Sequence, residues 1–401
     1  MKIIERKEYL DWLIRWKEQQ IIKVVSGVRR CGKSTMFEIY SDYLIQSGVD
    51  AAQIISINFE DADYEHLTNY RTLYDYIKGV LLPDKMNYLF LDEIQHVEDF
   101  EKAVDSLFLK KHCDVYITGS NAYFLSSELA TLLSGRYVEL KMLPLSFKEF
   151  CSGLGRGAAK TALFAQYMKI GSFPYLLKFA QHEREVKEYL RALYDTVLLK
   201  DIVKRLKISD VTSLESVAKF MLHNIGSIIS PTRIVNTMKS AGKGVDRKTV
   251  DKYIKGLCDS LILYEAARYN IKGKGFLSTQ SKYYCADIAL RNLLVRGKDS
   301  DIGHILENIV FLELKRRGYD VYAGQFDGAE VDFVAISPDS TMYYQVAATT
   351  LDENVLKREL SSLRKISDNY PKFLLTLDEV FDKADYDGIQ KLNVIDWLLS
   401  P

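Results

Sequence analysis

The sequence has no long apolar run and no excess of charge of either sign. Its 401 residues include 54 Lys and Arg against 54 Asp and Glu, so no overall positive field favours nucleic acid or an anionic membrane as a partner. No window approaches the ~18 apolar residues of a membrane-spanning helix, and the amino-terminal residues lack the apolar stretch of a signal peptide. We therefore expect a soluble, cytoplasmic protein with no membrane partner.

The cysteines and histidines do not show the spacing of a metal site. The five cysteines are dispersed and form no CxxC pair, which argues against a zinc site and a disulfide framework and fits a reducing compartment. The six histidines show no HxxxH or HExxH spacing, and no GxSxG motif indicates a hydrolytic serine. With 47% hydrophobic and 27% charged residues, a chain of this length is predicted to form two to three globular domains.

A phosphate-binding loop is the clearest motif that is present. Residues 21–26 form an apolar, β-branched run typical of a buried strand, and an amphipathic helix is predicted over residues 36–44. The segment between them fits GxxxxGK[ST] at every fixed position and consists of Gly27, Val28, Arg29, Arg30, Cys31, Gly32, Lys33, Ser34 and Thr35.

This order of elements suits the binding of ATP. Glycines let successive backbone N–H groups face one anion, and the helix N-terminus adds a partial positive charge. Lys33 is predicted to reach the β- and γ-phosphates, and the hydroxyl of Ser34 is predicted to ligate Mg²⁺. Cys31 stands at a variable position of the motif, and we interpret it as filling space beside the phosphates.

Acidic and small polar residues follow two further predicted strands. The apolar run at residues 88–91 ends in Asp92, placed to hold Mg²⁺ through water, and Glu93, placed to orient or deprotonate the attacking water. Residues 115–121 end in Gly-Ser-Asn. Because the ends of parallel strands lie at the ligand edge of a sheet, Ser120 and Asn121 are candidate sensors of the γ-phosphate, although a tight turn would favour the same residues.

Two more strands, at residues 54–59 and 137–140, complete a predicted five-stranded parallel sheet, and the expected fold class is α/β. Arg136 precedes the last strand, near the edge where we expect the γ-phosphate. It is a candidate arginine finger for the nucleotide of a neighbouring subunit, which makes a homo-oligomer a candidate assembly. A solvated or ion-paired arginine is the alternative.

The motifs GVRRCGKST, FLDEIQ, TGSN, SGR, PLSFKEF and GSFPYLL together resemble the AAA+-type P-loop ATPases of bacteria and archaea, whose C-terminal half is usually labelled as of unknown function. The resemblance covers nearly the whole chain. It implies ATP and Mg²⁺ as cofactors, an ATPase core at residues 1–143 and a helical lid at residues 144–208. In related ATPases a Gly-x-x-Pro turn of the lid approaches the nucleotide, and residues 171–174 occupy that place here, so Pro174 is a candidate nucleotide contact. A turn without a ligand role is the alternative.

Residues 209–298 are predicted to form a winged helix-turn-helix. Helices are expected over residues 214–225, after Ser230-Pro231 and from Asp246, followed by two β-rich stretches and a Gly/Lys-rich wing. Several lysines are predicted to face away from the apolar side of the third helix or to lie in the wing: Lys248, Lys252, Lys255, Lys272 and Lys274. DNA is therefore a candidate partner, and a packing or protein-binding module is the alternative.

Residues 299–401 show a predicted αβββαβ order that resembles the PD-(D/E)XK nuclease superfamily. The resemblance assigns metal-binding positions to Glu307 and Asp332, but Gln345 and Ala347 stand where the family has an acid and a lysine. A lysine there activates water and stabilises charge on the phosphate, and alanine does neither. We therefore expect a degenerate, restriction-endonuclease-like domain. Lys357 on the next helix is an alternative cation, and a structural module without nuclease ancestry is an alternative to the whole interpretation.

The leading hypothesis is a Mg²⁺-dependent ATPase that acts as a nucleotide-driven switch coupled to a DNA- or protein-binding C-terminal half. Two alternatives remain open. One is a nuclease whose cutting is regulated by ATP, and the other is a non-catalytic, ATP-dependent scaffold or receptor for a protein partner.

Overall fold

The chain divides into two units in a computed structural model that describes residues 4–119, 133, 135–155, 157–295, 302–380 and 382–400. The first unit is Met1–Pro144 with Asp259–Leu261, and the second is Leu145–Cys258 with Ile262–Pro401. None of the helices in these described ranges is both long and apolar enough to span a membrane. Each unit has its own sheet, and we describe the two separately.

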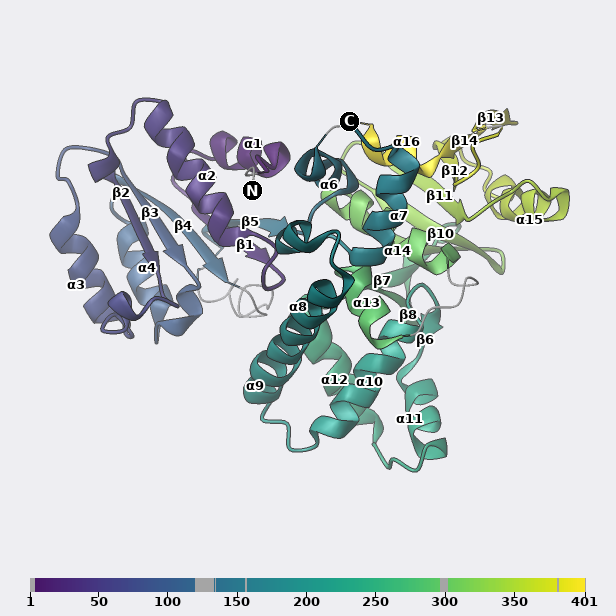
Figure 1. The fold of residues 1–401 in the computed structure, drawn as a ribbon, viewed down its shortest axis with the longest axis horizontal. Helices are drawn as coiled ribbons and strands as arrows, with labels where there is room; N and C mark the ends of the chain where they lie inside the picture. The colour runs from purple at the N-terminus through teal and green to yellow at the C-terminus, as the bar shows by residue number, and fades with distance from the viewer. Residues whose placement is uncertain are drawn as a thin grey trace. The chain divides into compact units, whose positions relative to one another are not determined.

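The first unit is built on a five-stranded parallel sheet with the strand order β2-β3-β4-β1-β5 (Figure 1). The strands are β1 (Ile22–Gly27), β2 (Ile54–Asn58), β3 (Asn87–Asp92), β4 (Cys113–Gly119) and β5 (Tyr137–Met142). The predicted parallel sheet and the α/β class are confirmed. Strands β1, β3 and β4 are buried along their whole length, as expected of a parallel sheet covered on both faces.

Helices cover both faces of this sheet. They are α1 (Lys7–Arg15), α2 (Lys33–Gln46), α3 (Tyr70–Val80) and α4 (Phe100–Phe108), with short turns η1 (Ala51–Gln53), η2 (Ala62–Tyr64) and η3 (Ile94–His96). Leu73 of α3 and Val104 of α4 belong to the apolar core on one face. On the other face Tyr40 of α2 packs against Phe90 and Tyr116, with ring centroids 5.9 and 5.3 Å apart. Because all five strands run parallel, their carboxyl ends lie at the same edge of the sheet.

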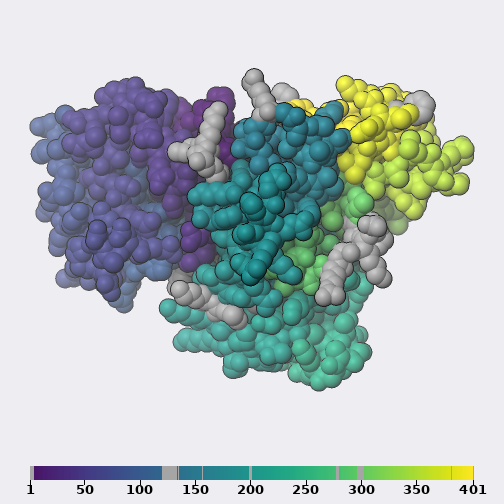
Figure 2. Space-filling view, viewed as in Figure 1, coloured from purple at the N-terminus to yellow at the C-terminus, as the bar shows by residue number. Residues whose placement is uncertain are grey.

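The second unit begins with helices, in the region where a lid is predicted. They are α6 (Phe147–Leu154), α7 (Lys160–Ile170), η5 (Pro174–Phe179), α8 (Glu183–Asp195), η6 (Thr196–Val203) and α9 (Lys204–Leu206). Figure 2 shows that this teal segment covers much of one face of the second unit. The motif PLSFKEF contains a capping box, because Ser146 and Glu149 each accept a hydrogen bond from the other's backbone N–H, at 3.1 and 2.8 Å.

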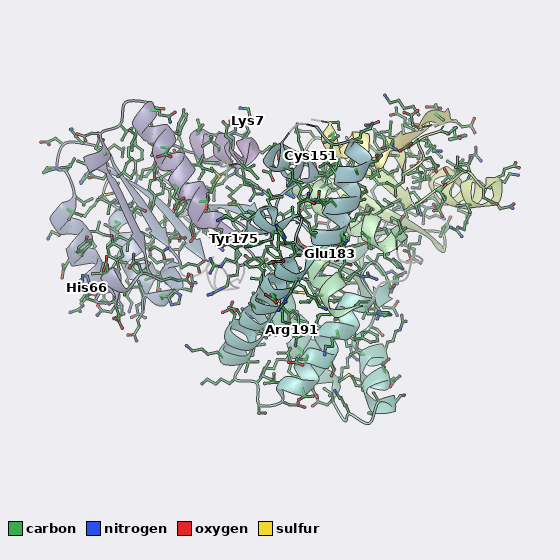
Figure 3. The ribbon with its side chains drawn as sticks, viewed as in Figure 1. Lys7, His66, Cys151, Tyr175, Glu183 and Arg191 are labelled. Carbon is green, nitrogen blue, oxygen red and sulfur yellow. The ribbon has the colours of Figure 1, made fainter. Side chains whose placement is uncertain are left out.

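Helices α7, η5 and α8 are also tied to one another by side chains. The ring of Tyr175 in η5 packs at a tilt against that of Tyr189 in α8, with ring centroids 5.1 Å apart. Glu183, in the first turn of α8, forms an exposed ion pair with Lys169 of α7. Figure 3 shows Tyr175 and Glu183, together with Arg191 further along α8. These contacts order the start of α8 relative to the turn that precedes it.

The elements that follow appear in the order predicted for a winged helix. They are α10 (Val211–His223), β6 (Ile228–Ile229), α11 (Pro231–Ser240), α12 (Arg247–Asp259), β7 (Leu263–Asn270), β8 (Gly275–Cys285) and α13 (Ile288–Leu294). Ser230 caps α11 by accepting a hydrogen bond from the Arg233 N–H at 3.3 Å, and Pro231 is its first residue. In α12, Val250, Tyr253, Ile254 and Leu257 are buried as expected.

The predicted αβββαβ order is also present. It comprises α14 (Ile302–Arg316), β9 (Asp320–Phe326), β10 (Ala329–Ile336), β11 (Thr341–Ala347), α15 (Glu353–Arg364) and β12 (Lys372–Thr376). Three elements beyond it were not predicted: β13 (Lys383–Tyr386), β14 (Ile389–Asn393) and α16 (Val394–Leu399). Phe333 packs on Phe311 of α14, whereas Val334 lies in the core with Leu360 of α15. Because neighbouring residues of a strand face opposite sides, α14 and α15 cover opposite faces of the sheet.

The hairpin β7–β8 is not a free wing. The second unit has one mixed sheet of nine strands, in the order β13-β14-β12-β11-β10-β9-β7-β8-β6. Strand β7 pairs in parallel with β9, so that Arg268 lies opposite Ala323 and Asn270 opposite Gln325. The strands predicted to form the wing therefore continue the sheet of the C-terminal region, and the assignment of a winged helix stays a prediction.

Candidate nucleotide-binding site

The loop between β1 and α2 has the backbone that a phosphate cradle requires. Gly32, which precedes α2, has a φ of 104°, in the region that favours glycine. A Cβ atom at Gly27 would lie 2.5 Å from the carbonyl oxygen of Met142 and 2.7 Å from Sγ of Cys31. Only glycine fits at position 27, because the loop packs directly on the end of β5. The buried Cys31 fills the space inside the loop, and burial raises the pKa of its thiol.

Lys33 and Glu93 come together from two motifs that are far apart in the sequence. Lys33 begins α2, its side chain is buried, and Nζ donates a hydrogen bond to the carbonyl oxygen of Gly27 at 3.0 Å. The same Nζ lies 3.5 Å from Oε1 of Glu93. An ammonium held at the start of a helix, beside the loop's backbone, is suited to bind phosphate oxygens.

Asp92 and Ser34, the two predicted magnesium ligands, are neighbours in the structure. Burial raises the pKa of Asp92, and the nearby Ser34 hydroxyl and the hydrogen bond from Thr118 partly offset this effect. A hydroxyl beside a buried carboxylate is a donor set that fits Mg²⁺ held jointly with nucleotide phosphates.

Thr118 links the two acids and was not identified from the sequence. Its hydroxyl donates a hydrogen bond to Oδ1 of Asp92 and accepts one from the N–H of Glu93 at 2.9 Å. Glu93 itself has a φ of 55°, where β3 ends, and its Oε2 accepts a hydrogen bond from Gln95 at 2.5 Å. Positive φ at a non-glycine residue costs ~1–3 kcal/mol and often accompanies a functional site. Ser120 and Asn121, the residues predicted instead of Thr118, lie outside the described ranges.

Arg6 is a second residue that the sequence analysis missed. Its guanidinium donates hydrogen bonds to the carbonyl oxygens of Cys31 at 2.8 Å and Leu143 at 2.7 Å. The Arg6 side chain is buried, and it ties the middle of the loop to the end of β5. No motif includes this arginine, which stands 25 residues before Cys31. Its role arises only from the folded arrangement.

The other residues of the loop differ in exposure. Val28 is buried, while Arg30 is exposed and has a φ of 67°. Arg29 forms an ion pair with Glu60 at 3.3 Å. Ser34 and Thr35 are exposed in the first turn of α2. Both residues are therefore accessible at the end of the helix where phosphates are expected.

Arg136 does not lie where the sequence analysis expected. Strand β5 pairs in parallel with β1, and the N–H of Ile22 donates a hydrogen bond to the carbonyl oxygen of Arg136 at 2.9 Å. Arg136 is therefore beside the start of β1, whereas the phosphate-binding loop follows its end. The expected position near the γ-phosphate edge of its own subunit is wrong. A role at the nucleotide of a neighbouring subunit stays a prediction.

The turn before Pro174 has a structural explanation within the second unit. Asp287 accepts hydrogen bonds at Oδ2 from the N–H and the hydroxyl of Ser172, at 2.5 and 2.6 Å, and at Oδ1 from the N–H of Ala289 at 2.7 Å. A Cβ atom at Gly171 would lie 2.1 Å from Oδ1 of Asp287. Burial raises the pKa of Asp287 to about 6. Packing alone thus explains the glycine, and a nucleotide contact by Pro174 stays a prediction.

The residues mapped to the nuclease-like centre lie close together, but around an unexpected lysine. Glu307 and Asp332 both contact Lys282 of β8, at 3.3 Å each. The side-chain oxygen of Gln345 accepts a hydrogen bond from the N–H of Asp332 at 3.3 Å. The alternative cation, Lys357, instead forms an exposed ion pair with Glu353 at 2.7 Å. The missing lysine at Ala347 is therefore not replaced from α15.

Comparisons with known proteins extend over most of the chain. Residues 19–151 match a family model described as AAA domain, and residues 161–301 match one described as a domain of unknown function (DUF8612). An uncharacterized protein of Haemophilus influenzae is 39% identical over 402 residues, which is 99% of each chain. Uncharacterized protein MJ1544 of Methanocaldococcus jannaschii is 29% identical over 398 residues, covering 92% of this chain and 86% of that protein.

The solved structures include more distant similarities. The ORC1 protein of Aeropyrum pernix in complex with DNA is 12% identical, with 75% of this chain and 94% of that chain covered and a TM-score of 0.34. A similarity at this level supports no conclusion about partners.

Proposed function

Since this chain belongs to one family with its Haemophilus influenzae relative and carries an AAA domain at residues 19–151, we propose that it binds and hydrolyses ATP with Mg²⁺. One observation carries the proposal. Lys33 and Ser34 from the phosphate-binding loop meet Asp92 and Glu93 from the end of β3 at one edge of the sheet. Phosphate binding, metal binding and water activation each have a side chain there.

The proposed chemistry assigns each residue a separate task. The backbone N–H groups of the loop and the Lys33 ammonium bind the β- and γ-phosphates, and Lys33 exchanges its contact with Glu93 for phosphate oxygens. Ser34 and Asp92 would hold Mg²⁺, which would neutralise charge on the phosphates. Glu93, released from Lys33, orients a water molecule, and its carboxylate takes the proton as the water oxygen bonds to the γ-phosphorus and the bond to the ADP oxygen breaks.

Two substitutions test this assignment. Lys33→Ala removes a charge-assisted contact, so ATP binding should weaken by about 30- to 100-fold, equivalent to ~2–3 kcal/mol. Glu93→Gln retains the shape of the side chain but accepts no proton, so ATP should still bind while turnover falls by at least ~100-fold. Lys78→Ala, at an exposed lysine of α3, is the matched control. Calorimetric titration with ATP and phosphate release measure the two effects.

The outcomes separate the alternatives. Turnover at the wild-type rate in Lys33→Ala would refute the phosphate-binding role. Full activity in Glu93→Gln would transfer the water-positioning role to another residue, with Ser120 and Asn121 the next candidates. ATP binding without turnover in the wild-type protein would favour the non-catalytic scaffold over the ATPase.

We further propose that the second unit is the output of this ATPase and binds DNA or a protein. The proposal rests on three lysines of α12, Lys248, Lys252 and Lys255, which are exposed opposite the buried face of that helix. ATP can drive such a switch only if it binds two conformations with different affinity. Measuring the affinity for ATP with and without double-stranded DNA tests the coupling, because linkage requires DNA affinity to change by the same factor.

A further inference from the structure

The side chain of Lys282 is surrounded by carboxylates inside the second unit. Its Nζ lies 2.6 Å from Oε1 of Glu330, 3.3 Å from Oε2 of Glu307 and 3.3 Å from Oδ1 of Asp332. Only 2% of the Lys282 side chain is exposed. Three acidic oxygens from α14 and β10 thus converge on one buried ammonium from β8.

The two buried acids, Asp332 and Glu307, also have partners other than Lys282. Oδ2 of Asp332 accepts a hydrogen bond from the N–H of Val346 at 2.9 Å, and Oε2 of Glu307 accepts one from the Tyr284 hydroxyl at 3.3 Å. His304 Nδ1 lies 3.6 Å from Oε1 of Glu307. The acids are therefore fixed from several elements around the lysine.

Gly226, in the loop after α10, packs closely against the side chains of His304 and Glu307. A Cβ atom at Gly226 would lie 2.9 Å from Nδ1 of His304 and 3.0 Å from Oε2 of Glu307. Gly226 has a φ of 73°, so glycine is favoured there both by its backbone and by the close approach. Lys282, Glu307 and Asp332 are accordingly buried beneath it.

We propose that the ammonium of Lys282 takes the place of a divalent cation among Glu307, Glu330 and Asp332, and that removing it converts this cluster into a metal site. Three carboxylates around one point form a donor set for a hard divalent ion. Buried carboxylates need a positive partner, which Lys282 supplies through its side chain. Across the described ranges, no group of three or more His, Cys, Asp and Glu side chains is arranged to hold a metal ion in the wild-type chain.

Titration of the nucleotide-free full chain with Mn²⁺, followed by electron paramagnetic resonance, tests the proposal. Lys282→Met preserves length without charge, so it should bind about one Mn²⁺ per chain at least ~10-fold more tightly than the wild-type protein. Adding Asp332→Asn to this variant should abolish that binding. Lys282→Arg retains a cation and should bind Mn²⁺ no more tightly than the wild-type protein, and Lys272→Met, at an exposed lysine, is the matched control.

Several results would overturn the proposal. One is Mn²⁺ binding by the wild-type chain that disappears in Asp332→Asn, because metal and lysine would then occupy the site together. Another is a folded Lys282→Met variant that binds no Mn²⁺. If Lys282→Met does not fold, Lys282→Gln and the comparison of wild-type protein with Asp332→Asn decide the question. None of these readouts depends on ATP turnover, so they are independent of the proposed ATPase.

Discussion

Arg6 donates a hydrogen bond from Nη1 to the carbonyl oxygen of Cys31 at 2.8 Å, and so connects the segment before α1 to the middle of the phosphate-binding loop. Nη2 of the same side chain bonds to the carbonyl oxygens of Leu143 and Pro144, at 2.7 and 3.3 Å. One buried guanidinium thus holds the loop against the end of β5. The loop is preorganised by a residue that does not belong to the nucleotide-binding motifs.

Replacing Arg6 should weaken ATP binding without altering a proposed phosphate contact. Arg6→Met leaves buried carbonyl groups without their charged partner, which costs ~1–3 kcal/mol. We expect about 10-fold weaker ATP binding and a lower thermal midpoint, measured by calorimetric titration and thermal unfolding. Arg15→Met, at an exposed arginine of α1, is the control. An unchanged affinity for ATP in Arg6→Met would show that the loop does not depend on this anchor.

Thr118→Val should reduce turnover more than ATP binding. Valine has a similar shape but neither donates to Asp92 nor accepts from the N–H of Glu93, so kcat should fall about 10-fold or more, with the Kd for ATP within ~3-fold of wild type. Because the Thr118 hydrogen bond lowers the pKa of Asp92, its loss should move the acid limb of the pH–rate profile to higher pH.

The pH shift distinguishes positioning from simple stability. Thr72→Val, at an exposed threonine of α3, is the matched control and should change neither kcat nor the pH profile. A Thr118→Val variant with the wild-type kcat and pH profile would remove Thr118 from the proposed machinery.

The motifs of the ATPase core were predictable because each combines a local pattern with a specific chemistry. Glycines, a lysine and a hydroxyl at fixed spacing, between a strand and a helix, identify the phosphate-binding loop directly. Arg6, Thr118 and Lys282 form no such pattern. The partners of each lie at least 25 residues away in the sequence, so only the register of the folded strands and helices brings them together.

The second unit shows two other limits of sequence-based prediction. Strand β7 pairs with β9, although the sequence analysis assigned the two strands to separate domains. The pairing was not predicted because a hydrophobic pattern does not identify which strand lies beside another. Strands β13 and β14 are short and largely polar, so an alternation of apolar and polar residues did not identify them in the sequence. The signal that was available is the turn between them, because Asp387 and Gly388 have φ values of 58° and 87°, as expected of an Asp-Gly hairpin.

If Arg136 acts on the nucleotide of a neighbouring subunit, its effect should appear only in an oligomer. Arg136→Ala should then bind ATP normally but turn over ~1,000-fold more slowly. Mixing Arg136→Ala with Glu93→Gln protein should restore part of the activity, because hybrid interfaces combine an intact arginine with an intact glutamate. Phosphate release measures this, with Arg71→Ala at an exposed arginine of α3 as the control. An unchanged rate in Arg136→Ala would exclude the finger role.

DNA binding through α12 should depend on Lys248, Lys252 and Lys255. Each lysine that contacts a phosphate contributes about one unit to the slope of log affinity against log salt, so replacing all three with alanine should flatten the slope by about three units. Fluorescence anisotropy with duplex DNA across a salt series measures it. No binding by the wild-type protein at low salt would exclude DNA as the partner.

Two comparisons make this test more specific. Lys272 forms an ion pair with Asp327 at 3.1 Å, in the hairpin that continues the sheet, so Lys272→Ala should change the slope less than any α12 lysine. A triple alanine variant at Lys178, Lys187 and Lys219, which are exposed elsewhere in the second unit, removes the same charge and is the control. Equal slopes in both triple variants would indicate an unspecific charge effect.

The C-terminal region should not cut DNA, although an ammonium does lie at its cluster of acids. A nuclease of the type it resembles needs carboxylates that hold a metal ion, and here Glu307 and Asp332 both contact Lys282. Ala347 provides no second cation, and losing one preorganised stabiliser of transition-state charge costs about 100- to 1,000-fold in rate. Plasmid, linear and branched DNA, incubated with the protein in Mg²⁺ and separately in Mn²⁺, should therefore remain intact.

Cleavage by the wild-type protein that disappears in Asp332→Ala would contradict this prediction. If that cleavage also disappears in Lys282→Met, Lys282 is the cation that the nuclease uses. Conversely, cleavage gained in Ala347→Lys would show that the acids are still arranged for catalysis and lack only a cation at that position.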